Sequence, residues 1–154
     1  MAARSSPTTG WSENTGEAAS TGGQAPIVAF RSAFARHDWE SGRGCFVDDL
    51  VFHDHRTLGF GALGRDEWIE SLRVLTDLAP GWGGETFRIL AWDRHGRVDV
   101  NRRFGTLRDG GPFETVFVRV IVTDGNRIQG YEIFDVGDAD QALARFAELC
   151  ALHA

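Results

Sequence analysis

The stretch Val47–Arg56 places ionisable side chains directly after a strand-like pattern. Neighbouring residues of a strand point to opposite faces of the sheet. If Phe52 faces an apolar core, Asp54 and Arg56 face the same way, and the two histidines that flank Asp54 face the other. A carboxylate and a guanidinium would then lie at the mouth of a hydrophobic interior. The pattern therefore predicts a ligand pocket with acid–base chemistry.

An inward carboxylate in an apolar pocket has a poorly solvated charge, which raises its pKa, whereas a neighbouring arginine opposes that rise. Such a group suits Asp54 as a general base that acts on an activated C–H bond or on a water molecule. The alternative is that Asp54 forms a structural ion pair with Arg56 or Arg102 at the rim. A raised pKa of Asp54 would favour the catalytic interpretation.

Strict alternation through the later strands predicts which other side chains face inward. In the catalytic hypothesis Asp135 or Glu114 is the second acid, and His55 carries a proton or donates a hydrogen bond at the strand end. Arg102 and Tyr131 orient the substrate or stabilise developing charge. The inward set comprises Asp54, Arg56, Arg102, Phe104, Glu114, Tyr131 and Asp135.

Two tryptophans, Trp68 and Trp82, flank the helix that follows this stretch and are expected to close the pocket opening, although core packing is the more common role for a residue such as Trp68. The glycine-rich segment 59–64 lacks the spacing of a phosphate-binding loop and is expected to be a hinge or lid. No serine or cysteine has an evident base partner that would make it a nucleophile.

Two histidines spaced as His53-x-His55 would share one face of a strand and could bind a metal ion. A third ligand is not evident, because the remaining histidines fall at a helix end, in a turn and in the tail. We therefore expect no metal and no other cofactor.

The length of 154 residues fits one domain. Residues 1–25 are poor in apolar side chains and are expected to form a disordered tail, which leaves 26–154 as a single domain. The formal net charge of −6 provides no basic field, so nucleic acid is not an expected partner. The 11 Phe and 5 Trp can line an apolar pocket or simply pack a small core.

Cys45 and Cys150 are far apart in the sequence and belong to no metal-binding or redox pair. We expect buried, reduced thiols in a cytoplasmic protein. A disulfide between the two cysteines is the alternative, and the sequence does not decide between them. The sequence has neither a basic segment followed by an apolar one at its start nor an apolar run of about 18 residues. No export signal and no membrane association are therefore expected.

The hydrophobic pattern has the period of helices in the first half and of strands from Glu85 onward. These elements make an α+β fold, in which helices cover one side of a curved sheet. The expected helices are 26–37, 39–47, a third that Asp66 caps and Pro80 ends, and a closing helix capped by Asp138 or Asp140; the expected strands are 47–56, 87–92, 98–104, 113–123 and 127–135.

This order, with Val-Asp-Asp-Leu-Val-Phe at 47–52 and Gly-Arg-Asp-Glu-Trp at 64–68, resembles the nuclear transport factor 2-like (NTF2-like) superfamily and its SnoaL-like group. The resemblance implies a cone-shaped fold in which three N-terminal helices and a curved, mostly antiparallel sheet enclose a pocket, often in a homodimer. Members include ketosteroid isomerases, polyketide cyclases, dehydratases, epoxide hydrolases and non-catalytic domains. The fold alone therefore does not decide the function.

Residue matches within that resemblance narrow the chemistry. Asp54 falls where ketosteroid isomerases carry the general base, but Phe30 and Val118 fall where those enzymes carry the oxyanion-hole donors. Neither can donate a hydrogen bond, so steroid-type isomerisation is disfavoured. Asp54, Arg102 and Asp135 supply the residue types of the limonene-epoxide-hydrolase-like Asp–Arg–Asp set, although the usual spacing is not reproduced.

Two hypotheses follow from these observations. The first is a small cofactor-independent enzyme that acts by acid–base catalysis on a hydrophobic oxygenated molecule, such as a polyketide-type metabolite, through cyclisation, isomerisation or epoxide opening. The second is a non-catalytic ligand-binding or dimerisation module of the same fold.

Overall fold

The computed structural model describes residues 11–12 and 24–152, so the predicted disordered tail, 1–25, lies almost wholly outside the described residues. No helix in this described part is long and apolar enough to cross a membrane. The elements in chain order are β1 (Trp11–Ser12), α2 (Ala25–Ala35), α3 (Trp39–Gly44), β2 (Val51–Asp54), β3 (Gly61–Gly64), α4 (Arg65–Leu78), β4 (Gly83–Asp93), β5 (Gly96–Thr106), β6 (Pro112–Thr123), β7 (Ile128–Phe134), the 3-10 helix η2 (Val136–Asp138) and α5 (Ala139–Leu152).

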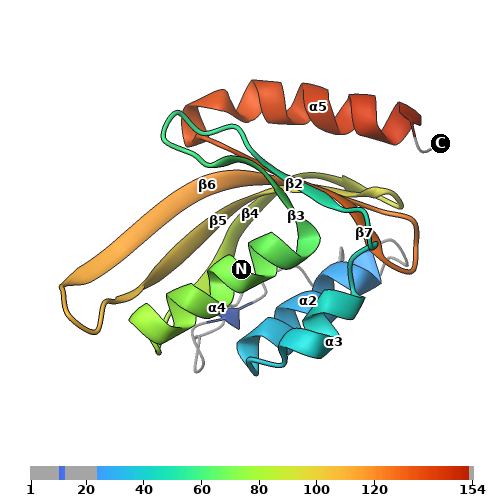
Figure 1. Ribbon diagram of the computed structural model, residues 1–154. Coiled ribbons are helices and arrows are strands. Elements are labelled where there is room, and N and C mark those ends of the chain that lie inside the picture. The colour runs from blue at the N-terminus through green and yellow to red at the C-terminus, as the bar shows by residue number, and fades with distance from the viewer. Residues whose placement is uncertain (1–10, 13–23, 153–154) are drawn as a thin grey trace, which may run out of the picture.

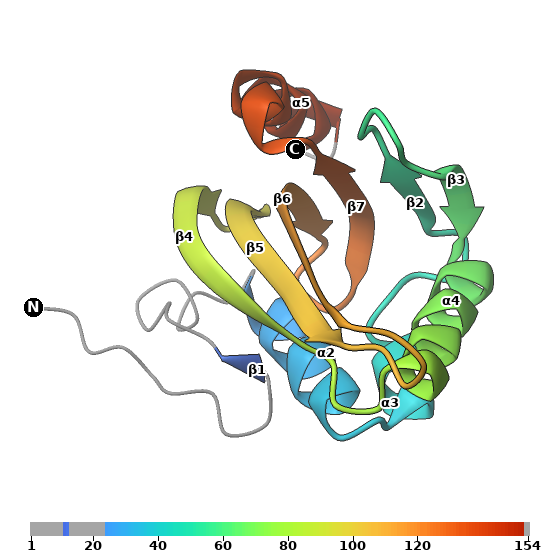
Figure 2. The ribbon, with the colours of Figure 1, turned by 90° about the vertical axis from the view of Figure 1, so that its left-hand side faces the viewer.

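The strands form one curved sheet in the order β1-β4-β5-β6-β7-β2-β3 (Figures 1 and 2). Strands β4 to β7 are an antiparallel meander, whereas β2 joins β7, and β1 joins β4, in parallel. Two irregularities in the β4–β5 register, at Thr86/Arg88 and Ile89/Ala91, bend this half of the sheet. The predicted α+β fold with a curved, mostly antiparallel sheet is confirmed.

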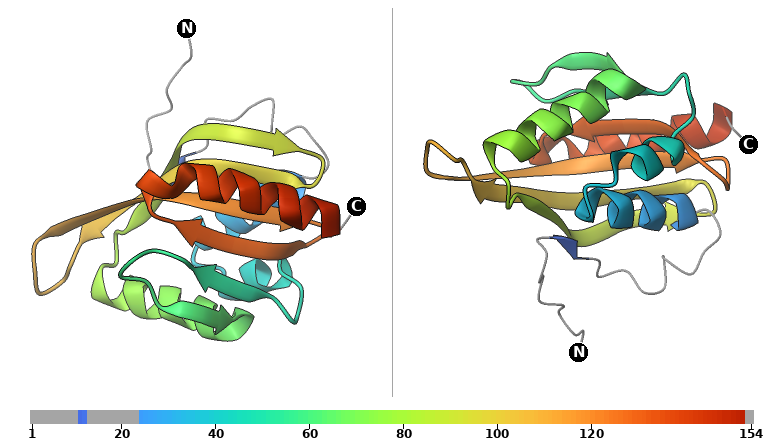
Figure 3. Two further views of the ribbon diagram at one scale, coloured as in Figure 1. Left: turned by 90° about the horizontal axis from the view of Figure 1, so that it is seen from above. Right: turned by 60° about the horizontal axis from the view of Figure 1, so that its bottom comes forward.

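Helices cover both faces of the sheet, not one. The three N-terminal helices lie beneath the concave face, and α5 crosses the opposite face (Figures 1 and 3). The position of α5 follows from β6, whose even-numbered residues Val118, Val120 and Val122 form a second apolar layer against Phe146 and Leu149 of α5. An apolar strand face needs such a cover, and the closing helix provides it.

The main core lies between the concave face and the N-terminal helices. The predicted stripe of α2, namely Ile27, Phe30 and Phe34, is buried there. Trp68 of α4 stacks on Phe52 with ring centroids 5.0 Å apart. This aromatic layer joins helices and sheet tightly and leaves little free space on that side.

The helix that contains Trp68 begins two residues earlier than predicted. Its N-cap is Gly64, whose backbone N–H donates to the Glu67 carboxylate at 3.0 Å. Asp66, the expected cap, lies in the first turn, where it accepts hydrogen bonds from Arg43 and Arg65 at 2.9 and 3.0 Å. A carboxylate in the first turn also interacts favourably with the helix dipole. An aspartate is therefore favourable there as well as at the N-cap, which explains why Asp66 lies two residues after the observed cap.

Most of the expected glycine-rich lid is a strand. Gly61–Gly64 pairs antiparallel with β2 from Val51↔Gly64 to Asp54↔Gly61. This pairing satisfies the backbone groups of β2 on the side away from β7. Only residues 55–60 are left as a loop, and they follow Asp54 directly.

Candidate functional site

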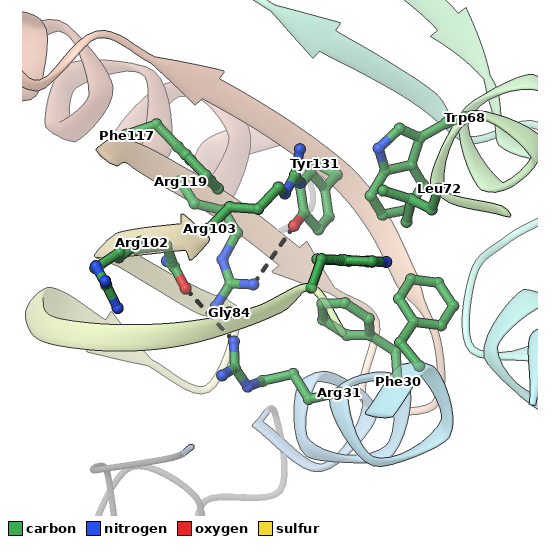
Figure 4. A pocket seen from close by; sticks show the side chains of 13 residues that line it. Phe30, Arg31, Trp68, Leu72, Gly84, Arg102, Arg103, Phe117, Arg119 and Tyr131 are labelled. Carbon is green, nitrogen blue, oxygen red and sulfur yellow. Dashed lines mark hydrogen bonds between the residues drawn. The ribbon is translucent and has the colours of Figure 1, made fainter. Parts of the chain in front are cut away.

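A small cavity lies between the concave face of the sheet, α2 and α4 (Figure 4). Its room of about 30 Å³ is enough for a water molecule or two. Six large apolar side chains form most of its wall: Phe30, Phe34, Trp68, Leu72, Trp82 and Phe117. The polar lining comes from the guanidinium groups of Arg31, Arg103 and Arg119, the Asn101 amide and the Tyr131 hydroxyl.

The sheet register shows that odd-numbered residues of β5 and β6 face the cavity. Asn101 lies opposite Phe117 there, and Asp99 lies opposite Arg119. The predicted inward orientation of Arg102, Phe104 and Glu114 is therefore wrong: Arg102 borders the cavity, but its guanidinium donates to Glu114 and Glu85 and lies 4.1 Å from the centre of the Phe104 ring. Alternation fixed which residues share a face but not which face is inside, because the other face is also covered, by α5.

A fully buried carboxylate, Asp99, organises the far side of the cavity. It accepts hydrogen bonds from Arg97 Nε at 2.7 Å, from Arg119 Nε and Nη2 at 3.0 and 2.7 Å, and from the Asn101 amide. Burial raises the pKa of Asp99, but the charges of Arg119 and Arg97 outweigh it and hold the pKa below its usual value. The alternation of the strands did not predict this cluster, although an arginine within the apolar run Val116–Val122 is a signal for it.

Asp54 faces the concave side, as predicted, and its side chain is fully buried. Oδ1 accepts from the Arg56 backbone N–H at 3.2 Å and from Arg56 Nε at 2.9 Å, while Oδ2 accepts from Arg56 Nη2 at 2.8 Å and from the Phe60 N–H at 3.2 Å. These four bonds fill the acceptor sites of a carboxylate. Burial raises the pKa of Asp54, but the hydrogen bonds from Arg56 and Phe60 lower it by more. The pKa of Asp54 therefore lies below its usual value. The geometry matches the structural ion pair that was the alternative to a general base.

The Asp54 carboxylate also ties down the loop 55–60. A Cβ at Gly59 would lie 2.3 Å from Asp54 Oδ1, so the loop closes over the carboxylate only with glycine at this position. A proton acceptor for a ligand would become available only if this loop moved away.

Asp54→Asn is expected to lower the free energy of unfolding by about 2–3 kcal/mol at neutral pH, because Arg56 loses its charged partner. The folded-state pKa lies below the unfolded value of about 3.9, so this stabilisation is present above that pH and is lost as the pH falls through the lower folded pKa. Urea unfolding of both proteins at pH 7 and near pH 3 measures the difference. The exposed Asp49→Asn serves as control, and an equal effect of the two substitutions would contradict the ion pair.

Three predicted site residues lie away from the cavity. His55 Nε2 is 2.8 Å from Glu132 Oε1 on the face that α5 covers, where Arg145 also donates to Glu132. Asp135 follows the end of β7 and accepts from Thr57 N and Oγ1 at 2.9 and 3.0 Å. Glu114 belongs to the outer pair with Arg102. The structure therefore brings neither His55 nor Glu114 together with Asp54, whereas Asp135 lies near Arg56, the partner of Asp54.

Three other predicted residues do lie at the cavity: Trp68, Trp82 and Tyr131. Both tryptophans are buried in its wall, so they pack the core and do not close an opening. The Tyr131 hydroxyl is 3.4 Å from Arg119 Nη1, which donates to it. The proton of the hydroxyl is thus left to be donated to another acceptor.

Arg103 is the side chain in the cavity whose charge is not matched. Its guanidinium lies between two aromatic rings, with Cζ 5.6 Å from the centre of Trp82 and 5.4 Å from that of Phe117. Within residues 24–152 it forms no ion pair and no hydrogen bond, in contrast to Arg119. Burial lowers its pKa. Figure 4 shows it extending from β5 across the cavity.

No three His, Cys, Asp or Glu side chains in the described part of the chain come close enough to hold a metal ion. His53 and His55 do stack, with ring centroids 5.8 Å apart, on the face away from the cavity. Cys45 and Cys150 are free, half-buried thiols.

No protein-family model and no curated protein matches the sequence. Solved structures do match. An NTF2-like protein of unknown function from Burkholderia pseudomallei is 18% identical, with a TM-score of 0.60 over 79% of this chain and 97% of that one. An LEH-like epoxide hydrolase from M. tuberculosis is 19% identical, with a TM-score of 0.60 over 86% of this chain and 97% of that one. IdmH, a putative polyketide cyclase from Streptomyces antibioticus, is 19% identical, with a TM-score of 0.61 over 81% of this chain and 98% of that one.

These proteins share the fold of this chain, while their low identity carries no information on the reaction. Together with the concave cavity beneath the sheet, the agreement establishes the architecture. The chain has the NTF2-like fold, as its element order predicted.

Proposed function

We propose that the chain binds a small oxygenated organic molecule in its anionic form, as a carboxylate, phenolate or enolate, with Arg103 as the group that pairs with the anion. The observation that carries this proposal is the unmatched Arg103 guanidinium between Trp82 and Phe117. A half-buried cation without an acidic partner is less stable than a paired one, and a ligand anion would provide that partner. Aromatic walls on both sides suit a planar anionic head group.

The carboxylates of the concave side support anion binding over proton abstraction. Asp54 and Asp99 each accept four hydrogen bonds and have lowered pKa values, so neither has an acceptor site left for a ligand proton. What the cavity offers a ligand is hydrogen-bond donors, namely Arg103 and the Tyr131 hydroxyl. The geometry therefore supports the ligand-binding hypothesis more directly than catalysis by Asp54.

Benzoate and its neutral isostere benzamide test the proposal by titration of tryptophan fluorescence or of the Trp82 indole N–H resonance. Wild-type protein is expected to bind benzoate more tightly than benzamide. Arg103→Met is expected to weaken benzoate binding by about 30-fold or more, because it removes the charge that faces the anion. Arg94→Met is the control, since this exposed arginine in the turn after β4 does not line the cavity. Equal affinity for benzoate and benzamide, or equal loss in both variants, would overturn the proposal.

A second candidate is an enzyme that works through an enolate. Arg103 and the Tyr131 hydroxyl present a cation and a proton donor to one cavity, which is the arrangement that stabilises a developing oxyanion. In this version Asp54 is the base once the loop 55–60 has released it. The names of the similar structures, an epoxide hydrolase and a putative polyketide cyclase, fit such chemistry on this fold.

Exchange of the methyl protons of acetophenone in D₂O tests the enzymatic version by NMR. Wild-type protein is expected to accelerate the exchange, and Asp54→Asn to reduce the acceleration by about 100-fold. Asp49→Asn, on the surface, is the control. Exchange no faster with wild type than with buffer leaves binding as the function, and full activity of Asp54→Asn removes the base.

A further inference from the structure

The cavity is too small for the ligand that the proposed function requires. Its room of about 30 Å³ holds an acidic head group of a few atoms, not a ring. The wall toward α2 and α4 is closely packed, with Trp68 within 4.7 Å of Tyr131 and Phe30 within 5.3 Å of Phe34, measured between ring centroids. The body of a ligand therefore has to lie on another side of the cavity.

A much larger hollow opens beside β6, where its pairing with β7 stops. The two strands pair from Val118↔Phe134 to Thr123↔Ile128, so the first half of β6 has no strand on that side among the described residues. Figure 3 shows this part of the β5–β6 hairpin projecting beyond the rest of the sheet. The hollow, which we call the slot, has room for about 440 Å³ and is lined by Arg56, Thr57, Leu58, Thr115, Val116 and Asp135.

One aromatic ring links the slot to the cavity. Phe117 lines the cavity, and Arg56 lines the slot. The Phe117 ring centre is 5.9 Å from Arg56 Cζ and 5.4 Å from Arg103 Cζ, so the ring has a cation of each compartment beside it. The two spaces therefore adjoin at the Phe117 ring.

The groups around the slot suit the apolar body of a ligand. Its one cation, Arg56, is already paired with Asp54. Leu58, which is 96% exposed, and Val116 supply apolar surface, while Thr57 and Thr115 are small and neutral. Asp135 already accepts two hydrogen bonds from Thr57.

We infer that the slot is the outer half of the binding site and that the ligand is an elongated amphipathic acid. Its acidic head lies against Arg103 in the cavity, and its apolar body passes Phe117 and lies in the slot against Leu58. This inference rests on the proposed anion binding and adds the shape and chemical class of the ligand to it.

Three acids of increasing length test the inference: acetate, benzoate and 4-biphenylcarboxylate. Acetate supplies the head alone. In wild-type protein 4-biphenylcarboxylate is expected to bind at least about tenfold more tightly than benzoate, because its second ring removes apolar surface from water in the slot. NMR titration covers the weak acetate binding as well as the tighter binding of the longer acids.

A charge in the slot provides the decisive variant. Leu58→Glu is expected to weaken the binding of 4-biphenylcarboxylate by about fivefold or more and to change the binding of acetate by less than about twofold. Only the apolar body of the longer acid lies near the new carboxylate. The substitution is on a highly exposed side chain, so folding is preserved. Leu152→Glu, which is also exposed but lies at the end of α5, is the matched control. Thr115→Trp, which fills the slot, is expected to act like Leu58→Glu.

The outcomes separate the two proposals. If no acid binds to wild-type protein, or if Arg103→Met leaves acetate binding unchanged, the anion site itself is wrong. If the acids bind through Arg103 but lengthening gives no gain, or if Leu58→Glu and Leu152→Glu behave alike, the slot is not part of the binding site, while the anion site stands.

Discussion

Asp99→Asn is expected to lower the free energy of unfolding by about 3–5 kcal/mol, because it removes one partner from a buried charge cluster. Arg97 and Arg119 would keep their charges in a fully buried setting and lose the carboxylate that both contact. The amide that replaces it has one acceptor oxygen, and its NH₂ group faces donors. Denaturant unfolding of the full chain measures the loss.

Asp109→Asn, in the exposed turn after β5, is the matched control for this cluster and is expected to change stability by less than about 0.5 kcal/mol. The pKa of Asp99 is lowered in the folded state, so the stabilisation is present above pH 4 and is lost as the pH falls through the lower folded pKa. If Asp99→Asn unfolds with the midpoint of wild type, the cluster makes no net contribution to stability.

Trp82→Ala is expected to lower the free energy of unfolding by about 3–5 kcal/mol, since it leaves a cavity in the core. Trp82 is 3% exposed and donates through its indole N–H to Thr76 at 2.8 Å. Its ring also forms one wall beside Arg103. The substitution should therefore weaken benzoate binding as well as folding.

Trp92→Ala is the control for this substitution, because Trp92 lies on β4 with 44% of its surface exposed. It is expected to cost about 1 kcal/mol or less and to leave benzoate binding unchanged. Thermal unfolding and the fluorescence titration measure both effects. Equal destabilisation by the two substitutions would show that the buried packing of Trp82 in the cavity wall does not stabilise the fold.

Most of the architecture follows from local pattern. The α2 stripe at Ile27, Phe30 and Phe34 has the period of a helix with one buried face, and the turns between the later strands fall where glycine and aspartate permit them. Such signals act over a few residues, so the order of helices and strands can be obtained without tertiary information. The inward orientation of Asp54 followed in the same way, from its spacing to the buried Phe52.

The candidate site was predicted less well, because both faces of the central strands are buried. On β5 the alternation of Val98, Val100 and Arg102 against Asp99, Asn101 and Arg103 fits either orientation, and only the position of α5 identifies the first set as outer. The choice between them exchanges Arg102 for Arg103 as the arginine in the cavity. A one-residue change of frame of this kind moves every side chain of a strand to the other face.

The sequence by itself determined the element order, the α+β class and the face of β2 that carries Asp54, since these depend on spacing along the chain. Only the tertiary structure decided the chemistry of the cavity. Hydrogen bonds from Arg56 and the Phe60 backbone occupy Asp54, and Asp99 is matched by Arg97 and Arg119. Arg103 is left as the unmatched charge because the curvature of the sheet brings it between Trp82 and Phe117.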